Sequence, residues 1–200
     1  MESQAAEQLT ERVQSRLAQF EAAGGYVKST AQAEGAPKWL GLARDRFRVA
    51  YAWNADGGGR GYWQEMMQDA LAMTGDKQYR ISVAFRPNGQ MAAVASYRKW
   101  HYESRYMDKR YPEIYLSHIG STGKLAGAGT AVLMEVAKLA LVRARPAFAY
   151  VSKAGSFYAE LGWERIKVDP NGDHWIWPLE ACQVVVEAAS AQKAREALTI

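Results

Sequence analysis

The stretch that decides the fold is STGKLAGAGT, residues 121 to 130. It lies between an apolar segment, Ile114–Ile119, which is typical of a strand, and residues 127 to 143, whose apolar spacing predicts a long helix. Glycines allow the backbone to approach a ligand closely, and the first turn of a helix has N–H groups without partners inside the helix. Lys124 adds a positive charge. These features together predict a phosphate-binding loop.

Two common nucleotide-binding patterns do not fit this stretch. A P-loop requires Ser or Thr directly after its Gly-Lys pair, and Leu125 stands at that place. The dinucleotide fingerprint requires a third glycine, and Val132 stands there instead. On its own, the stretch is therefore also compatible with an ordinary glycine-rich start of a helix.

A second motif stands about forty residues further along the chain. It reads AGSFYAELGW, residues 154 to 163. With KLAGAG at 124 to 129 and the strand YLSHIG at 115 to 120, it resembles the GNAT superfamily of N-acetyltransferases. The family signatures are R/Q-x-x-G-x-G/A and A-x-x-F-Y-x-x-L-G-F; this chain has Lys first in the former and Trp last in the latter. The resemblance covers about residues 45 to 179.

Hydrophobic periodicity predicts the remaining elements. Their order is strand, helix, three strands, helix, strand, helix and two strands. This is a mixed α/β arrangement, in which helices cover a twisted and mostly antiparallel sheet, with extra helices at both ends. The expected elements are a helix at 4–22 ended by Gly24-Gly25, a linker at 26–37, a strand at 46–53, a helix at 61–73, strands at 79–85 and 91–100, a loop at 101–112, a strand at 114–119, a helix at 127–143, a strand at 147–151, a helix at 155–161, strands at 164–168 and 174–177, and a helix at 180–198.

Three regions follow from this order. Residues 1–44 are expected to form an N-terminal helix and linker, residues 45–179 a GNAT-like acetyltransferase domain, and residues 180–200 a helical tail. Members of the family are often dimers, so a homodimer is an expected assembly.

The resemblance implies acetyl-CoA as the co-substrate. Backbone N–H groups of residues 125 to 130 would hold its diphosphate, and residues 117 to 119 would pair with its pantetheine arm and polarise the thioester carbonyl. The residues expected to bind acetyl-CoA are Ser117, Ile119, Lys124, Leu125, Ala126, Gly127, Ala128, Gly129, Thr130 and Ser152.

The resemblance also implies direct attack of an amine on the thioester. Tyr158 matches the family tyrosine that donates a proton to the leaving thiolate, although it could equally pack the short helix. His118 is the candidate general base, because imidazole titrates near neutral pH. Its place on an apolar face favours a packed core histidine, and Glu113 and Tyr115 are the other candidates.

The composition limits the other classes of protein. A chain of 200 residues, 48% of them hydrophobic, can bury one sizeable core, and a net charge of +4 suits a polyanionic ligand. Cys182 is the single cysteine, and the three histidines lack metal-ligand spacing, so no metal is expected. The chain has no signal-peptide pattern and no apolar run of membrane-spanning length, so we expect a cytoplasmic protein.

Residues 98 to 111 combine five basic residues with four aromatic ones. Such a segment can bind nucleic acid, because bases stack on aromatic rings while cations contact phosphates. A solvated strand edge explains the same residues more simply. Three functions therefore stay open. The first is acetylation of a small-molecule or peptide amine. The second is action on nucleic acid, either a Mom-type modification of DNA or acetylation of a tRNA-linked amine, and the third is non-catalytic CoA binding.

Overall fold

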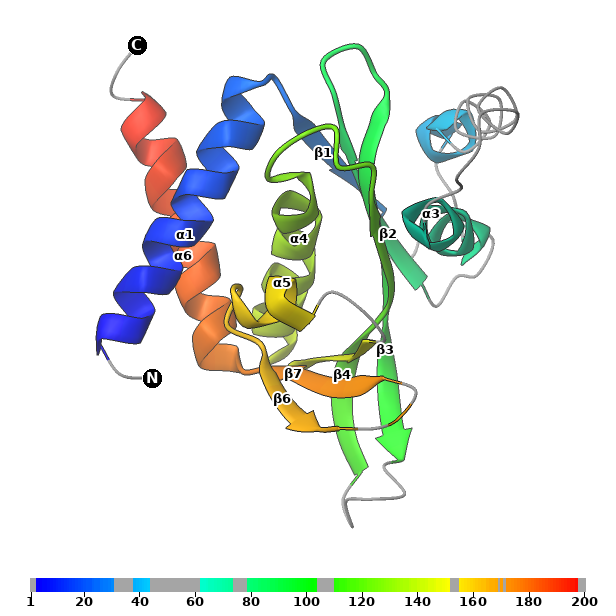
Figure 1. Ribbon diagram of the computed structural model, residues 1–200, viewed down its shortest axis with the longest axis vertical. Coiled ribbons are helices and arrows are strands. Elements are labelled where there is room, and N and C mark those ends of the chain that lie inside the picture. Colours follow the sequence, from blue (N-terminus) through cyan, green and yellow to red (C-terminus); the bar gives the residue numbers. More distant parts are fainter. Residues whose placement is uncertain are drawn as a thin grey trace. The chain divides into compact units, whose positions relative to one another are not determined.

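The structure, a computed structural model, describes residues 3–30, 38–43, 62–73, 79–103, 110–151, 155–168, 170 and 172–197. Within this part of the chain, seven strands form one sheet in the order β1-β2-β3-β4-β5-β7-β6 (Figure 1). Strands β4 and β5 pair in parallel, and the pairs β1–β2, β2–β3, β5–β7 and β6–β7 are antiparallel. The strands are β1 (Tyr26–Ser29), β2 (Tyr79–Phe85), β3 (Met91–Glu103), β4 (Arg110–Ser121), β5 (Ala147–Val151), β6 (Glu164–Lys167) and β7 (Asp173–Trp177).

Helices flank this sheet, which confirms the predicted fold class. Residues 38 to 43 are also helical. Among the described helices, none combines the length and the apolar character needed to cross a membrane. The named helices are α1 (Ser3–Ala22), α3 (Tyr62–Ala72), α4 (Ala128–Arg143), α5 (Gly155–Ala159) and α6 (Leu179–Ala197).

The chain divides into two compact units. One contains Met1–Ala18, Lys99–Leu116 and Leu133–Ile200, and the other contains Gln19–Arg98 and Ser117–Val132. We call them the terminal-helix unit and the loop unit. Helices α1 and α4 and strands β3 and β4 contribute residues to both units.

The core of the loop unit lies between helices and one face of β2 and β3. Alternate residues of β2, such as Ile81 and Val83, point to this face because side chains of a strand alternate between its two sides. Met67 and Leu71 of α3 and Leu40 of the helix at 38 to 43 pack against them. All five side chains are at most 2% exposed, so this face of β2 and β3 is shielded from solvent.

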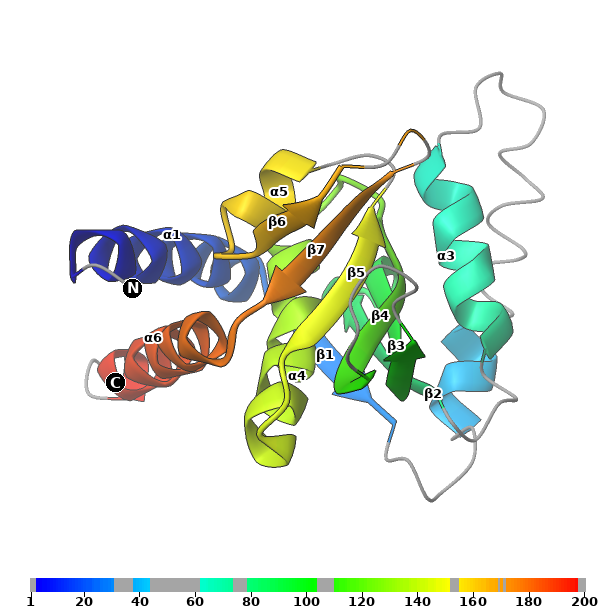
Figure 2. The same cartoon turned by 90° about the horizontal axis from the view of Figure 1, so that it is seen from below.

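The core of the terminal-helix unit is built around aromatic rings. The rings of Trp163 and Trp177 stack with centroids 5.0 Å apart. Trp177 is fully buried, as are Cys182 and Val185 of α6. The N-terminal part of α1 lies beside α6 (Figures 1 and 2), and the side-chain amide of Gln14 donates to a backbone carbonyl of that helix, Ala188 O, over 3.4 Å.

Two expectations about loops were wrong. The linker expected at 26 to 37 begins with β1, whose four residues pair with β2 from Tyr26 opposite Phe85 to Ser29 opposite Ser82. The loop expected at 101 to 112 is shorter, because β3 continues to Glu103 and β4 begins at Arg110. The strand expected at 46 to 53 lies outside the described residues. The other expected helices and hairpins are confirmed within a few residues of their ends.

Candidate functional site

The glycine-rich loop joins β4 to α4 through two left-handed residues. Gly123 has φ of 68° and Gly127 has φ of 75°, a region in which side chains are disfavoured. The N–H of Ala128 donates to Leu125 O over 3.3 Å and closes the turn from which α4 begins. The loop conformation therefore requires glycine at 123 and 127.

The N–H groups at the start of the loop are occupied. Thr122 N–H donates to Ala92 O over 2.8 Å. Gly123 N–H donates to Ser121 Oγ over 3.3 Å, and Lys124 N–H donates to Thr122 Oγ1 over 3.2 Å. These bonds fix the loop to β3 and to itself.

The N–H groups that follow are different. Five of the next six have no acceptor among the described residues. They stand at the N-terminal end of a 16-residue helix, where the helix dipole favours negative charge. The side chain of Lys124 is exposed beside them. This segment can therefore hold an anion with backbone donors. The five N–H groups belong to Leu125, Ala126, Gly127, Gly129 and Thr130.

The residues of this segment differ in exposure. Ala126 is exposed, while Gly127 and Gly129 are half-buried. Ala128 and Thr130 are 1% and 2% exposed and belong to the inner face of α4. Because the N–H of Ala128 is used in the turn, Ala128 contributes packing and no free donor.

The end of β4 supplies further polar groups. The register of β4 with β5 covers Ile114 to Leu116, and β4 continues to Ser121. Along this continuation Ser117 and Ile119 are half-buried. Ser117 Oγ is inaccessible to water and has no hydrogen-bond partner in the described part of the chain. A buried hydroxyl without a partner is costly.

His118 is held by a buried serine of the neighbouring strand. Its Nδ1 lies 3.2 Å from the Oγ of Ser96, which is fully buried on β3. Burial lowers the pKa of His118, and the charge of Asp69 on α3 opposes this shift. The imidazole is therefore neutral at physiological pH and can accept a proton. The sequence did not reveal Ser96 or Asp69, because strand pairing and helix packing bring them to His118.

Tyr158 lies on the one-turn helix α5, in the terminal-helix unit. The turn ends in a Schellman cap: Trp163 N–H donates to Tyr158 O, and Gly162 N–H donates to Ala159 O, both over 3.1 Å. Gly162 has φ of 80°, as this cap requires. The ring of Tyr158 is 4% exposed and meets Trp163 edge to face at 5.1 Å. The L-G-W part of the second motif therefore forms the cap that holds Tyr158.

The remaining candidates are placed as follows. Ser152 lies outside the described residues, and so does the side chain of Glu113. Tyr115 is half-buried and stacks on Phe148 of β5, with centroids 5.9 Å apart. No group of three or more His, Cys, Asp or Glu side chains suited to a metal ion occurs in the part of the chain that the structure describes.

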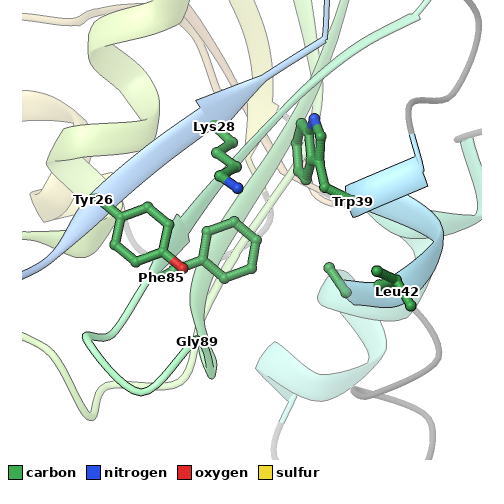
Figure 3. A pocket seen from close by; sticks show the side chains of 7 residues that line it. Tyr26, Lys28, Trp39, Leu42, Phe85 and Gly89 are labelled. Carbon is green, nitrogen blue, oxygen red and sulfur yellow. The ribbon is translucent and has the colours of Figure 1, made fainter.

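The loop unit also has an aromatic pocket of about 140 Å³ (Figure 3). Tyr26 stacks on Phe85, with centroids 5.2 Å apart, and Trp39 meets Phe85 edge to face at 6.1 Å. The Nζ of Lys28 lies 5.9 Å from the ring of Tyr26 and 6.0 Å from that of Trp39. These contacts anchor β1 and the helix at 38 to 43 to β2.

Comparison with known proteins agrees with this geometry. No family model matches the chain, and no curated protein sequence matches it. Solved structures do match. A mutant of the toxin AtaT, bound to the C-terminus of the antitoxin AtaR and acetyl-CoA, is 12% identical with a TM-score of 0.54, over 80% of this chain and 97% of that one.

Two further structures match over a similar length. AtaT complexed with acetyl-methionyl-tRNAfMet is 12% identical with a TM-score of 0.50, over 80% of this chain and 98% of that one. The KacTA–DNA complex is 13% identical with a TM-score of 0.50, over 79% and 96%. The chain has a GNAT fold. In this GNAT fold, the loop after β4 and the cap after α5 coincide with the two motifs found in the sequence.

Proposed function

We propose that this protein is an N-acetyltransferase that moves an acetyl group from acetyl-CoA to an amine. The observation that carries the proposal is that five of the six N–H groups from Leu125 to Thr130, at the start of α4, have no acceptor among the residues that the structure describes. The diphosphate of CoA is an anion of the kind that such donors bind. The structure of AtaT with acetyl-CoA, which shares the fold, supports this choice of ligand.

The residues present fit acetyl-CoA in two ways. The free N–H groups and Lys124 supply donors and positive charge for the diphosphate. The half-buried residue Ser117 is proposed to pair with the pantetheine arm through its backbone groups. Ile119 and the backbone of this part of β4 extend that contact. Ser152 is retained as a proposed cofactor contact on the family resemblance alone.

The proposed reaction is a direct transfer. The lone pair of the amine attacks the thioester carbonyl, so that a C–N bond forms and the C–S bond breaks. The amine loses one proton to a base, and the leaving thiolate gains one proton. We assign the base to His118, which is neutral at physiological pH, and the acid to Tyr158. A phenol of pKa about 10 suits a thiolate of roughly similar basicity.

Substitution of Tyr158 tests the acid. Tyr158→Phe should lower kcat by roughly 10²-fold, in the range typical of general acids, and leave the Kd for acetyl-CoA unchanged. Tyr150→Phe is the matched control, because it removes the same hydroxyl from a tyrosine that is 40% exposed. Some of the similar structures carry tyrosine-to-phenylalanine changes, which makes this substitution a natural comparison. An unchanged kcat would remove Tyr158 from the mechanism.

Ligand-dependent stability tests the cofactor separately from the acceptor. Acetyl-CoA at a hundred times its Kd should raise the free energy of unfolding by about 2.7 kcal/mol. Adenosine, which lacks the diphosphate and the pantetheine arm, should have no effect. A protein that acetyl-CoA does not stabilise would lack the proposed site, whereas stabilisation without turnover of any amine would indicate non-catalytic CoA binding.

A nucleic-acid-linked amine is the second candidate acceptor. The similar structures include one complex with a tRNA and one with DNA. In this chain the net charge is +4, and the guanidinium of Arg98 lies over the ring of Tyr79 at 4.8 Å, at the start of the basic and aromatic segment 98 to 111. Labelled acetyl-CoA should be offered with aminoacyl-tRNA, duplex DNA, peptides and polyamines. Mass spectrometry then identifies which acceptor gains the acetyl group.

Homodimerisation stays a proposal that follows from the family resemblance. Light scattering after size exclusion should give a mass near twice that of the 22.2 kDa chain. A mass near 22.2 kDa would show a monomer.

A further inference from the structure

Helices from both ends of the chain meet at the cap that follows Tyr158. A Cβ at Gly162 would lie 2.9 Å from Leu9 Cδ2 of α1 and 3.1 Å from Ala181 Cβ of α6. Carbon atoms do not approach so closely without a shift of the neighbours. Gly162 is therefore required both by its left-handed backbone and by the packing of α1 and α6.

Arg12 of α1 completes the hydrogen bonding of the same cap. Its Nη1 donates to the backbone carbonyl of Glu160 over 2.9 Å. The last carbonyls of a helical turn have no donor within the turn, and a Schellman cap satisfies only some of them. Arg12 thus supplies, from 148 residues away, a donor that α5 does not contain.

Arg16, one turn further along α1, contacts residues on both sides of Tyr158. Its Nη2 forms an ion pair with the carboxylate of Glu160, and its guanidinium lies over the ring of Phe157 at 5.7 Å. The side chains of Arg16 and Glu160 are 26% and 44% exposed, so the pair contributes little to global stability. Instead, the pair restrains the orientation of α5, which has five residues and is too short to be stable alone.

We infer that Arg12 and Arg16 are positioning residues, which hold the α5 segment so that Tyr158 keeps its catalytic orientation. The inference rests on the proposed function, in which Tyr158 is the acid. It makes α1, which lies outside the GNAT resemblance, part of the catalytic apparatus. Small misplacements of a catalytic group lower the rate strongly, by up to about 10²-fold for 1 Å.

Substitution of the two arginines tests the inference by the split between kcat and KM. In the R12M/R16M variant, kcat should fall about tenfold, less than for complete loss of the acid. KM for acetyl-CoA should stay within about twofold, because the free N–H groups of residues 125 to 130 are unaltered. R12K/R16K, which keeps both charges and a donor, should recover most of the rate. R86M is the matched control, because the side chain of Arg86 donates to Gln90 Oε1 within the β2–β3 turn, away from α1 and α5 in the sequence.

A double-mutant comparison separates positioning from general damage. If the arginines act through Tyr158, R12M/R16M should cause no further loss of kcat in the Tyr158→Phe background. Losses that multiply in the combined variant would overturn the inference, and so would a wild-type kcat in R12M/R16M. A wild-type protein that releases no CoA from acetyl-CoA with any acceptor would instead refute the proposed function.

Hydrogen exchange gives a readout that needs no activity. The amides of Leu161, Gly162 and Trp163 make the hydrogen bonds of the cap. In R12M/R16M these amides should exchange about tenfold faster, while the melting temperature falls by no more than about 4 °C. Unchanged exchange at the three amides would overturn the inference even if no acceptor is known.

Discussion

The Nδ1 atom of His118 lies 3.2 Å from the Oγ of Ser96, and this contact joins a half-buried imidazole on β4 to a fully buried hydroxyl on β3. The contact restrains the orientation of the ring. Burial at the same place lowers the pKa of His118. The geometry and the lowered pKa both suit a base that is ready to accept a proton at neutral pH.

The first prediction concerns the pH dependence of the reaction. The pKa of His118 lies below its ordinary value of 6.5, so the imidazole that we propose as the base is neutral above pH 6.5, and kcat should fall only as the pH drops below that value. Because the unfolded chain binds this proton more readily, the free energy of unfolding should also fall below about pH 6.5. An NMR titration, assigned with His118→Gln and with His174→Gln as control, checks the pKa. A pKa above 6.5 would contradict the burial argument.

The second prediction concerns Asp69. Its negative charge raises the pKa of His118 and partly offsets the effect of burial. Asp69→Asn should therefore lower the pKa of His118 further, and Asp69→Glu, which keeps the charge, should leave it close to the wild-type value. The same NMR titration measures both variants. If Asp69→Asn raised the pKa of His118 or left it unchanged, the charge of Asp69 would not be a cause that raises this pKa.

The third prediction concerns the glycine that begins α4. Gly127→Ala places a side chain at φ of 75°, which should lower the free energy of unfolding by about 1–2 kcal/mol. It also places a methyl group beside the free N–H groups, so the Kd for CoA should rise about tenfold or more. Calorimetric titration with CoA measures the affinity, and thermal unfolding measures the stability.

Gly123→Ala is the matched control for that substitution. Gly123 has φ of 68°, so the cost in stability should be similar. However, a Cβ there meets nothing within 4 Å, and the N–H of Gly123 already bonds Ser121 Oγ. Its Kd for CoA should therefore change by less than about threefold, less than 1 kcal/mol of binding free energy. Equal losses of affinity in both variants would show that loop strain governs the binding of CoA and that contact with the anion does not.

The fourth prediction concerns the single cysteine. Cys182 is fully buried, and burial, with a smaller effect from Glu180, raises its pKa to about 12. Its thiolate is scarce at pH 8, so the native protein should not react with a thiol reagent such as DTNB, whereas the unfolded protein should react at once. Cys182→Ala should keep the wild-type kcat, as direct transfer without an acyl-enzyme requires. Rapid labelling of the native protein would contradict this placement.

Local patterns in the sequence were sufficient for most of the fold. The alternation around Ile81 and Val83, the Asn88-Gly89 turn and the apolar spacing of α4 are short-range features that fix each element before any packing is considered. The glycines of the two motifs also follow local rules, because Gly127 and Gly162 each occupy a left-handed backbone position in a turn.

Elements that depend on distant partners were missed. Strand β1 has four residues with little alternation of its own, and pairing with β2 makes it a strand. Residues 101 to 112 were predicted as a loop because their charges and Pro112 mask the alternation of a strand, yet part of this segment belongs to β3 and β4. No local pattern links Ser96 to His118 or Arg12 to Glu160, because tertiary packing alone brings these residues together.

The contact between Arg12 and Glu160 also has a consequence for the timing of folding. The two residues are separated by 148 positions, and a ribosome adds about 5–20 residues per second. Roughly 7–30 s therefore pass between the synthesis of Arg12 and the synthesis of Glu160, its partner in the cap. The interval is longer for Gln14 and its partner Ala188 of α6. Throughout that interval the apolar stripe of α1, which includes Leu9 and Val13, lacks its partners from the C-terminal half of the chain and is available to chaperones.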